Sequence, residues 1–373
     1  MKERFFSAPG RVEIGGNHTD HQHGRVLAAA INLDATCSAV PNDTNIVNII
    51  NEQYGSEKVD LSCLEVRDEE KGTSGALIRG IAAWFVRHGH TIGGFDATVT
   101  SNIPVGSGIS SSAAFEVLIG NVFKGLYGAD ISPLDIALAG QYAENVYFGK
   151  PCGLMDQAAS SFGGLSMIDF NNPENTVVKP IDADLTGYAL CVVATGGDHV
   201  DLTPEYSAIP EEMKTVANCF GKDFLREVSP DDFYSGLGKL RHLSGRALLR
   251  AIHFFDDHER VLKQAEALES GDIPSFLNLV TESGRSSLAY LQNVFSSSDP
   301  HHQELTLALA LSERILTGKG AWRVHGGGFA GTILTIVPDD MKDTFNKQMS
   351  DVFGNGCCLF LSVQKEGGRE VDS

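Results

Sequence analysis

The sequence lacks the features that mark membrane, secreted and zinc-binding proteins. No apolar run approaches the ~18 residues needed to cross a bilayer, and the start, Met-Lys-Glu-Arg-Phe-Phe, has no long apolar segment of a signal peptide. The seven cysteines are odd in number and show no C-x-x-C spacing, which argues against a disulfide framework and a zinc site. We therefore expect a cytoplasmic protein without a membrane partner.

Basic residues are also scarce. There are 29 of them against 48 acidic residues, so the net charge is -19. A field of this sign repels nucleic acid, which excludes it as an expected partner. The same field disfavours ATP, so a nucleotide site in this chain would need backbone N–H groups, a metal ion and a few well-placed cations.

No internal repeat is present, and the 373 residues suggest two domains. Patterns of β-branched residues predict strands, and periodic apolar residues predict helices. The mixture favours an α+β fold, and a polar stretch with two prolines over residues 171–187 suggests domains at 1–183 and 184–373. The expected strands are 26–40, 46–50, 95–100, 189–195, 322–325, 332–337 and 358–363. The expected helices include 75–88, 132–146, 238–255, 259–270, 302–316 and 341–353.

A glycine- and serine-rich loop lies between an expected strand and a strong helix former, in Pro104-Val105-Gly106-Ser107-Gly108-Ile109-Ser110-Ser111-Ser112-Ala113-Ala114. Glycines allow the backbone to approach an anion, and the first turn of a helix presents unpaired N–H groups. Alone, the loop could equally be a serine-capped helix after a glycine turn. It matches neither a Walker loop nor a dinucleotide fingerprint.

This loop resembles the phosphate loop of the GHMP kinases. The resemblance implies ATP binding, with Mg²⁺ held partly by Ser112 or, as the second choice, Ser111. The ATP-binding residues that it implies are Pro104, Gly106, Ser107, Gly108, Ser110, Ser111, Ser112 and Ala113.

A second cluster lies near the N-terminus, in Gly10-Arg11-Val12-Glu13-Ile14-Gly15-Gly16-Asn17-His18-Thr19-Asp20-His21. Polar Asn17, His18 and Asp20 in a glycine-rich turn could bind several hydroxyls of a sugar, although such a turn can also simply face solvent. The segment resembles the galactokinase signature, which implies that these three residues bind the substrate. The histidines at 18, 21 and 23 do not have the spacing of a zinc site.

Two positions depart from that signature. The galactokinase family usually has a glutamate where this chain has Asn17 and a tyrosine where it has His21. The amide of Asn17, unlike a glutamate, does not repel a C6 carboxylate on the sugar, so galacturonate becomes a candidate substrate. Asp20-His21-Gln22 also resembles the turn of galacturonate kinases, and arabinose and N-acetylgalactosamine are further alternatives.

The third cluster contains Glu144 and, twelve positions later, Asp156 in Cys152-Gly153-Leu154-Met155-Asp156-Gln157. Phosphoryl transfer needs a metal that neutralises charge and a group that orients or deprotonates the attacking hydroxyl. Isolated carboxylates are usually solvated surface groups. The motif resembles that of galactokinases, which implies Glu144 as a Mg²⁺ ligand, Asp156 as the base and Arg11 as the cation on the transferring phosphoryl group.

The same resemblance extends to the second half of the chain. It implies that Gly153 and Tyr206 contact the sugar. The cluster Gly326-Gly327-Gly328 resembles the third motif of the family, which supports the nucleotide loop and the sugar pocket.

Together the motifs imply an ATP- and Mg²⁺-dependent sugar 1-kinase whose partners are ATP and a small sugar, in a two-domain GHMP kinase fold. The N-terminal domain of that fold has a left-handed βαβ unit, and the C-terminal domain is ferredoxin-like. A monomer is expected, with a dimer left open. A non-catalytic sugar sensor on the same fold is the alternative from another class of protein.

Overall fold

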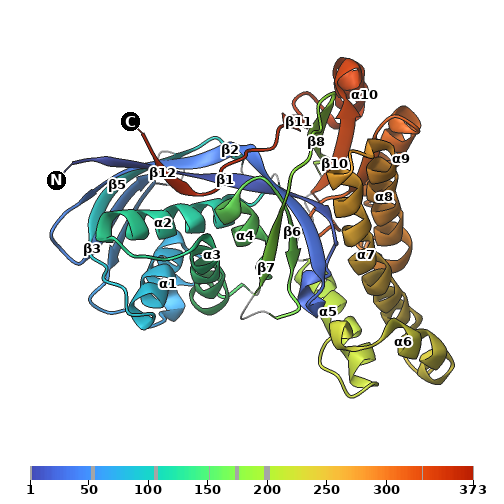
Figure 1. Ribbon diagram of the computed structural model, residues 1–373, viewed down its shortest axis with the longest axis horizontal. Coiled ribbons are helices and arrows are strands. Elements are labelled where there is room, and N and C mark those ends of the chain that lie inside the picture. The colour runs from blue at the N-terminus through green and yellow to red at the C-terminus, as the bar shows by residue number, and fades with distance from the viewer. Residues whose placement is uncertain are drawn as a thin grey trace.

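The computed structural model describes residues 2–51, 55–104, 108–150, 152–172, 176–196, 202–329 and 331–372. Two parts of the molecule lie side by side along its longest axis (Figure 1). The first is built on a sheet of eight strands among the described residues. They are β1 (Arg4–Gly15), β2 (Arg25–Pro41), β3 (Ile46–Asn51), β4 (Gly55–Asp60), β5 (Phe95–Ser101), β6 (Leu165–Asp169), β7 (Val177–Ile181) and β12 (Arg369–Val371).

β2 is the central strand of this sheet. One edge pairs with β1, while the other pairs with β6 over Arg25–Ala29 and with β5 over Ala35–Pro41. β1 is buried from Phe6 to Gly15. The glycine-rich signature therefore begins as a buried strand, and the chain turns only at Gly16, which has a φ of 84°.

Helices cover one face of the first sheet (Figure 1). They are α1 (Ser74–Arg87), α2 (Ser111–Tyr127), α3 (Pro133–Tyr142) with the π-helical turn η3 (Ala143–Phe148), and α4 (Met155–Phe162). β3 and β5 pair in parallel, and α1 lies on the connection between them, which forms the βαβ unit of the fold.

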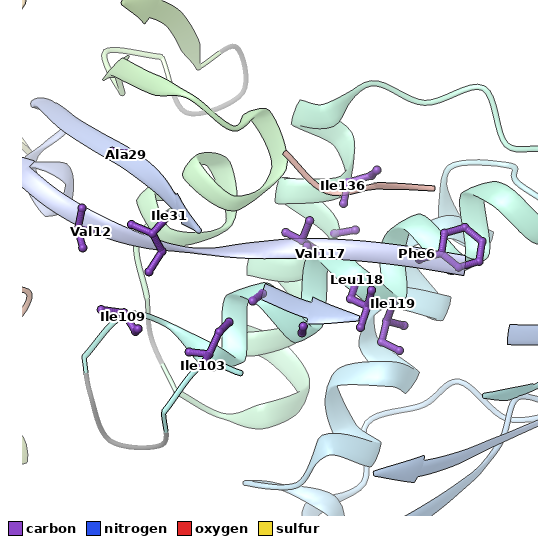
Figure 2. Packing of buried hydrophobic residues seen from close by; sticks show 14 of the residues in the cluster. Phe6, Val12, Ala29, Ile31, Ile103, Ile109, Val117, Leu118, Ile119 and Ile136 are labelled. Carbon is purple, nitrogen blue, oxygen red and sulfur yellow. The ribbon is translucent and has the colours of Figure 1, made fainter. Parts of the chain in front are cut away.

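The core between this sheet and its helices fixes the ends of the phosphate loop. Val117 and Leu118 of α2 belong to the same buried cluster as Phe6 of β1 (Figure 2). Ile103, which precedes the loop, and Ile109 within it are buried in that cluster as well. Apolar burial on both sides therefore anchors the loop to the sheet.

The second part is a four-stranded antiparallel sheet in the order β11-β8-β10-β9. Its strands are β8 (Tyr188–Ala194), β9 (Ala321–Val324), β10 (Thr332–Pro338) and β11 (Cys358–Leu361). Helices separate β8 from β9 and β10 from β11, so the chain order is that of a ferredoxin-like fold, as expected. The helices are α5 (Thr203–Asn218), α6 (Pro230–Gly236), α7 (Gly245–Glu269), α8 (Ile273–Ser286), α9 (Glu304–Leu316) and α10 (Lys342–Phe353).

The prediction of two helices over 238–255 and 259–270 is wrong, because α7 runs unbroken from Gly245 to Glu269. The polar residues Asp256, Asp257 and His258, which lie between the two expected helices, are part of this single helix. Asp257 has no exposed surface and binds the other half of the molecule. The helix α8 was not predicted, although Asp272 caps it and Pro274 occupies its first turn.

The chain passes from the first sheet to the second between Ile181 and Tyr188. The end of the chain returns to the first sheet, because β12 pairs with β1. Both described ends therefore lie on the same side of the molecule (Figure 1). A division into domains 1–183 and 184–373 remains our proposal, with residues 369–371 reaching back across it. Each helix within the described ranges is too short or too polar to span a bilayer.

Candidate active site

A buried Arg11 and a partly exposed Asp156 form a two-point ion pair at the centre of the site. Arg11 Nε donates to Asp156 Oδ1 at 2.7 Å, and Nη2 donates to Oδ2 at 2.8 Å. The third nitrogen, Nη1, donates to the carbonyl oxygen of Gly108 at 2.8 Å. Planar guanidinium groups suit this bidentate geometry. A side chain of β1 thus connects the first turn of α4 to the phosphate loop.

Asp156 is held as a carboxylate that still reaches solvent. Burial opposes its charged form, but the Arg11 guanidinium and the hydrogen bonds from Arg11 and Ser110 outweigh this, so the pKa of Asp156 lies below its ordinary value. The side chain remains 31% exposed. An ionised, oriented carboxylate with an open side is able to accept a hydrogen bond from a substrate hydroxyl.

The side chain of Ser110 hydrogen-bonds to Asp156 and does not cap its own helix, α2. Its Oγ donates to Asp156 Oδ2 at 2.5 Å, and its side chain does not cap α2. The residue has a φ of 61°, in the left-handed region. The first N–H groups of a helix have no acceptor within the helix. The amides of Ser111, Ser112 and Ala113 in the first turn of α2 therefore suit a phosphate.

The rest of the phosphate loop is placed only in part. Pro104 lies three residues after the end of β5, and Gly108 lies against the second half of the molecule. A Cβ atom at Gly108 would come within 2.8 Å of Thr332 Oγ1, and the residue has a φ of 72°. Gly106 and Ser107 lie outside the described residues, so their assignment to ATP stays a prediction.

Asp20 and Gly153 touch at the side of the site near the N-terminal turn. A Cβ atom at Gly153 would lie 1.9 Å from Asp20 Oδ2. The negative charges of Asp156, Glu13 and Asp20 act against burial and raise the pKa of Arg11, so Asp20 lies near the ion pair. The structure therefore brings together four residues of two sequence motifs: Arg11, Asp20, Gly153 and Asp156.

His18 is a buried, neutral histidine with one free acceptor. Burial, and then the charge of nearby His21, lower the pKa of His18 to about 3. Its Nε2 lies 3.0 Å from the carbonyl oxygen of Gly327, so Nε2 carries the proton and donates. The buried Nδ1 has no partner among the described residues. A neutral imidazole in this state accepts a hydrogen bond at Nδ1.

Asn17 is placed differently from the expected substrate contact. Its side chain has no exposed surface. Nδ2 donates to Glu13 Oε1 at 3.0 Å and to the carbonyl oxygen of Gly326 at 2.8 Å. Oδ1 accepts from Ser287 Oγ at 3.2 Å and from Asn293 Nδ2 at 2.8 Å. The amide is fully used inside the protein, and a direct contact between Asn17 and substrate stays a prediction.

Two residues of α7, which sequence reasoning missed, hold the backbone of the same turn. Asp257 Oδ2 accepts the N–H groups of Gly16 at 3.1 Å and Asn17 at 3.0 Å. His253 Nε2 donates to the carbonyl oxygen of Asn17 at 2.9 Å. An acidic residue between apolar positions of a helix was the one available signal, because charged residues are rarely buried without a partner.

The glycine cluster of the second half binds the sugar signature through its carbonyl groups. Gly326 accepts from Asn17, Gly327 pairs with His18, and Gly328 accepts from the Tyr206 hydroxyl at 2.8 Å. A Cβ atom at Gly327 would lie 2.4 Å from the Tyr206 ring. The expected supporting loop therefore lies beside the predicted sugar contacts.

The residues near Glu144 fit a divalent cation. Glu144 is buried, with Oε2 accepting from Gln157 Nε2 at 2.9 Å and Oε1 lying 3.3 Å from Lys150 Nζ. Ser112 lies one turn before Glu116 on α2, and Glu116 binds the same Gln157 amide. Among the described residues, no three acidic, histidine or cysteine side chains gather into a metal cage. Mg²⁺ commonly uses one or two carboxylates together with substrate phosphates, so this small donor set suits it.

Two family models match parts of the chain. The model described as GHMP kinases N terminal domain matches residues 76–164, and the galactokinase galactose-binding signature matches residues 1–41. Among solved structures, the galactokinase of Lactococcus lactis complexed with galactose has a TM-score of 0.86 at 23% identity, covering 99% of this chain and 95% of that one. The mevalonate kinase of Methanococcus jannaschii has a TM-score of 0.69 at 14% identity, covering 97% of this chain and 99% of that one. The fold is that of the GHMP kinases.

Curated relatives narrow the family further. A galactokinase of Glaesserella parasuis serovar 5 is 33% identical over 352 residues, which cover 92% of this chain and 88% of the relative. A galactokinase of Haemophilus influenzae strain Rd is 32% identical over 94% of this chain and 89% of its own length. The chain belongs to the galactokinase family, which places it among the ATP-dependent sugar kinases.

Proposed function

We propose that the protein transfers the γ-phosphate of ATP to the anomeric hydroxyl of galactose or a close analogue. The observation that carries this proposal is the Arg11–Asp156 pair, joined by Ser110 at the N-terminal end of α2. A carboxylate, a guanidinium and free helix N–H groups at one place are the parts that phosphoryl transfer requires. Membership of the galactokinase family supports the same reaction.

Asp156 receives the hydrogen bond of the attacking hydroxyl and orients its oxygen toward the phosphorus. Its lowered pKa makes it a weak base at neutral pH. Asp156 therefore positions the hydroxyl first, and takes the proton as the bond to phosphorus forms. Arg11 keeps Asp156 in this orientation and places positive charge beside the transferring group. The first turn of α2, from Ser111 to Ala113, binds phosphate oxygens.

The sugar contacts follow from the polar groups that remain open. Asp20 can accept two hydroxyls, and the backbone at Gly153 approaches closely because no side chain intervenes. His18 Nδ1 accepts a third hydroxyl. Tyr206, which is 36% exposed, offers its ring and hydroxyl at the edge of the glycine cluster. Asn17 contributes by holding this turn against the second half of the molecule.

Glu144 and Ser112 would hold Mg²⁺. When bound, the ion neutralises charge on the phosphates of ATP, which the strongly acidic chain alone does poorly.

Initial rates over a panel of sugars test the proposed substrate. We expect the highest kcat/KM with galactose, ahead of galacturonate, arabinose and N-acetylgalactosamine. A uronate turned over more efficiently than galactose would replace galactose with galacturonate. Sugar binding without ATP turnover would instead favour the non-catalytic sensor.

We also propose a cytoplasmic monomer. All seven cysteines are free thiols, which fits a reducing compartment. Light scattering of the purified protein gives the oligomeric state directly.

A further inference from the structure

A buried amide connects two carboxylates beside the proposed metal site. Gln157 Nε2 donates to Glu116 Oε2 at 2.8 Å and to Glu144 Oε2 at 2.9 Å. The three residues come from α2, η3 and α4, and Glu116 and Gln157 have no exposed surface. One NH₂ group has two hydrogens, so the two carboxyl groups use both hydrogens of Gln157 Nε2.

The packing of α3 keeps this arrangement in place. Gly140 lies over it, and a Cβ atom there would come within 3.0 Å of Glu116 Oε2 and 3.1 Å of Gln157 Cγ. Glu116 therefore anchors the amide from α2, while Glu144 of η3 accepts the other hydrogen of the same NH₂ group.

The other oxygen of Glu144 faces a movable cation. Lys150 follows Gly149, which ends η3 with a φ of 86°, and its side chain is 65% exposed. Its ammonium lies 3.3 Å from Glu144 Oε1. Glu144 is buried, but the lysine end of this ion pair is exposed and flexible, so the ammonium can leave the carboxylate for water. Oε1 is thus the oxygen that a dissolved cation can reach by displacing Lys150.

We propose that Gln157, anchored by Glu116, fixes Glu144 for the divalent ion, and that Lys150 competes with that ion for the free oxygen of Glu144. Gln157 and Glu116 are positioning residues, while Lys150 sets the metal concentration that the enzyme needs. This inference rests on the proposed role of Glu144 as a metal ligand. It predicts that replacing Lys150 tightens metal binding and that replacing Gln157 weakens it, although both residues contact the same carboxylate, that of Glu144.

The test measures binding of Mn²⁺ to the protein–ADP complex by electron paramagnetic resonance, which does not require turnover. Lys150→Met should bind Mn²⁺ about two- to fivefold more tightly, since a weak competitor is removed. Gln157→Met should bind it about tenfold or more weakly, as is common when a partner of a metal ligand is lost. Glu116→Gln should remain close to wild type, because an amide oxygen can still accept from Gln157.

Matched variants separate this inference from general charge effects. Lys179 forms an ion pair with Glu269 away from the site, so Lys179→Met removes the same charge and should leave Mn²⁺ binding unchanged. If both lysine variants bind Mn²⁺ more tightly by the same factor, Lys150 does not compete with the ion for Glu144. Unchanged or weaker Mn²⁺ binding in Lys150→Met would overturn that competition as well. Because Lys150 is exposed, this variant keeps the test decisive even if Gln157→Met fails to fold.

The metal role of Glu144 itself is checked separately. If Glu144→Gln binds Mn²⁺ as well as wild type does, the proposed ligand is wrong, and the inference falls with it. If Glu144→Gln loses the ion but Gln157→Met, shown to be folded by circular dichroism, keeps full affinity, only the positioning role is overturned.

Discussion

Asp156 and the turn at residues 16–20, which we propose to bind the sugar, are held in different ways. Asp156 has its charged partner on β1 and its hydroxyl partner at the start of α2, both in the first part of the molecule. The backbone of the turn is held from α7 by Asp257 and His253, in the second part. The side chains that bind Asp156 therefore lie in the first part, whereas sugar recognition, as we propose it, depends on how the two parts pack together.

Because of this difference, we expect that mutations can change sugar binding and phosphate transfer separately. A change between the parts should alter the KM for sugar and leave the ionisation of Asp156 intact. A change at Arg11 or Ser110 should do the reverse, because neither side chain hydrogen-bonds to the turn among the described residues.

The largest effect is expected from Asp156→Asn. An amide cannot accept the proton of the attacking hydroxyl, so kcat should fall by about 10³-fold or more. A coupled ADP-release assay measures this loss. Galactose affinity by calorimetry should change only a few-fold, since the turn is held elsewhere. A kcat within tenfold of wild type would remove Asp156 from the mechanism.

Arg11→Ala should lower kcat by about 10²–10³-fold, because it removes charge stabilisation at the transferring phosphoryl group. It should also shift the acid limb of the kcat/KM profile. Arg11 lowers the pKa of Asp156, so the wild-type carboxylate stays ionised further into acid. Without Arg11 that pKa rises, and the acid limb should move to higher pH.

Arg11→Lys is the matched control. It retains one positive charge without the two-point geometry, so it should lie between wild type and Arg11→Ala in both rate and acid limb. An acid limb that stays in place in both variants would show that Asp156 does not control it.

Asp257→Asn tests the turn at residues 16–20. Asp257 accepts two backbone N–H groups of the turn, so this change should raise the KM for sugar by about tenfold and leave the acid limb unchanged. The neighbouring Asp256→Asn is the control, because Asp256 contacts Tyr234 instead of the turn. A matching rise in the KM for ATP would contradict the separation of the two regions.

The same variant gives a pH-dependent stability effect. Burial opposes the charge of Asp257, but His253 and Arg260 outweigh it and lower the pKa of Asp257 below its ordinary value. A lowered folded-state pKa contributes stability above the ordinary pKa, and this contribution is lost as pH falls through the folded value. The difference in Tm between wild type and Asp257→Asn should therefore be largest near neutral pH and shrink in acid.

The phosphate side of the site was more predictable from sequence than the sugar side. The serine loop lies in a short motif whose local order, strand then loop then helix, already implies its placement, and the resemblance to the family motifs implied that Arg11 and Asp156 act beside it. The contact between Asp257 and Asn17 joins residues 240 positions apart. No local pattern encodes such a pair, so the sequence did not show that the backbone of Asn17 is bound by α7.

The smallest effect tests one hydrogen bond on the phosphate side. Ser110→Ala removes the donor to Asp156 Oδ2, so kcat should fall about three- to fivefold. The acid limb of the kcat/KM profile should move to slightly higher pH, because this hydrogen bond lowers the pKa of Asp156. Ser110→Gly removes the same donor but suits the positive φ of this position, so it should be about 1 kcal/mol more stable than Ser110→Ala. Equal rates in the two variants, together with a higher Tm for the glycine, would assign the rate loss to the hydroxyl. If Ser110→Gly instead restores the wild-type rate, backbone strain at Ser110 controls the rate rather than its bond to Asp156.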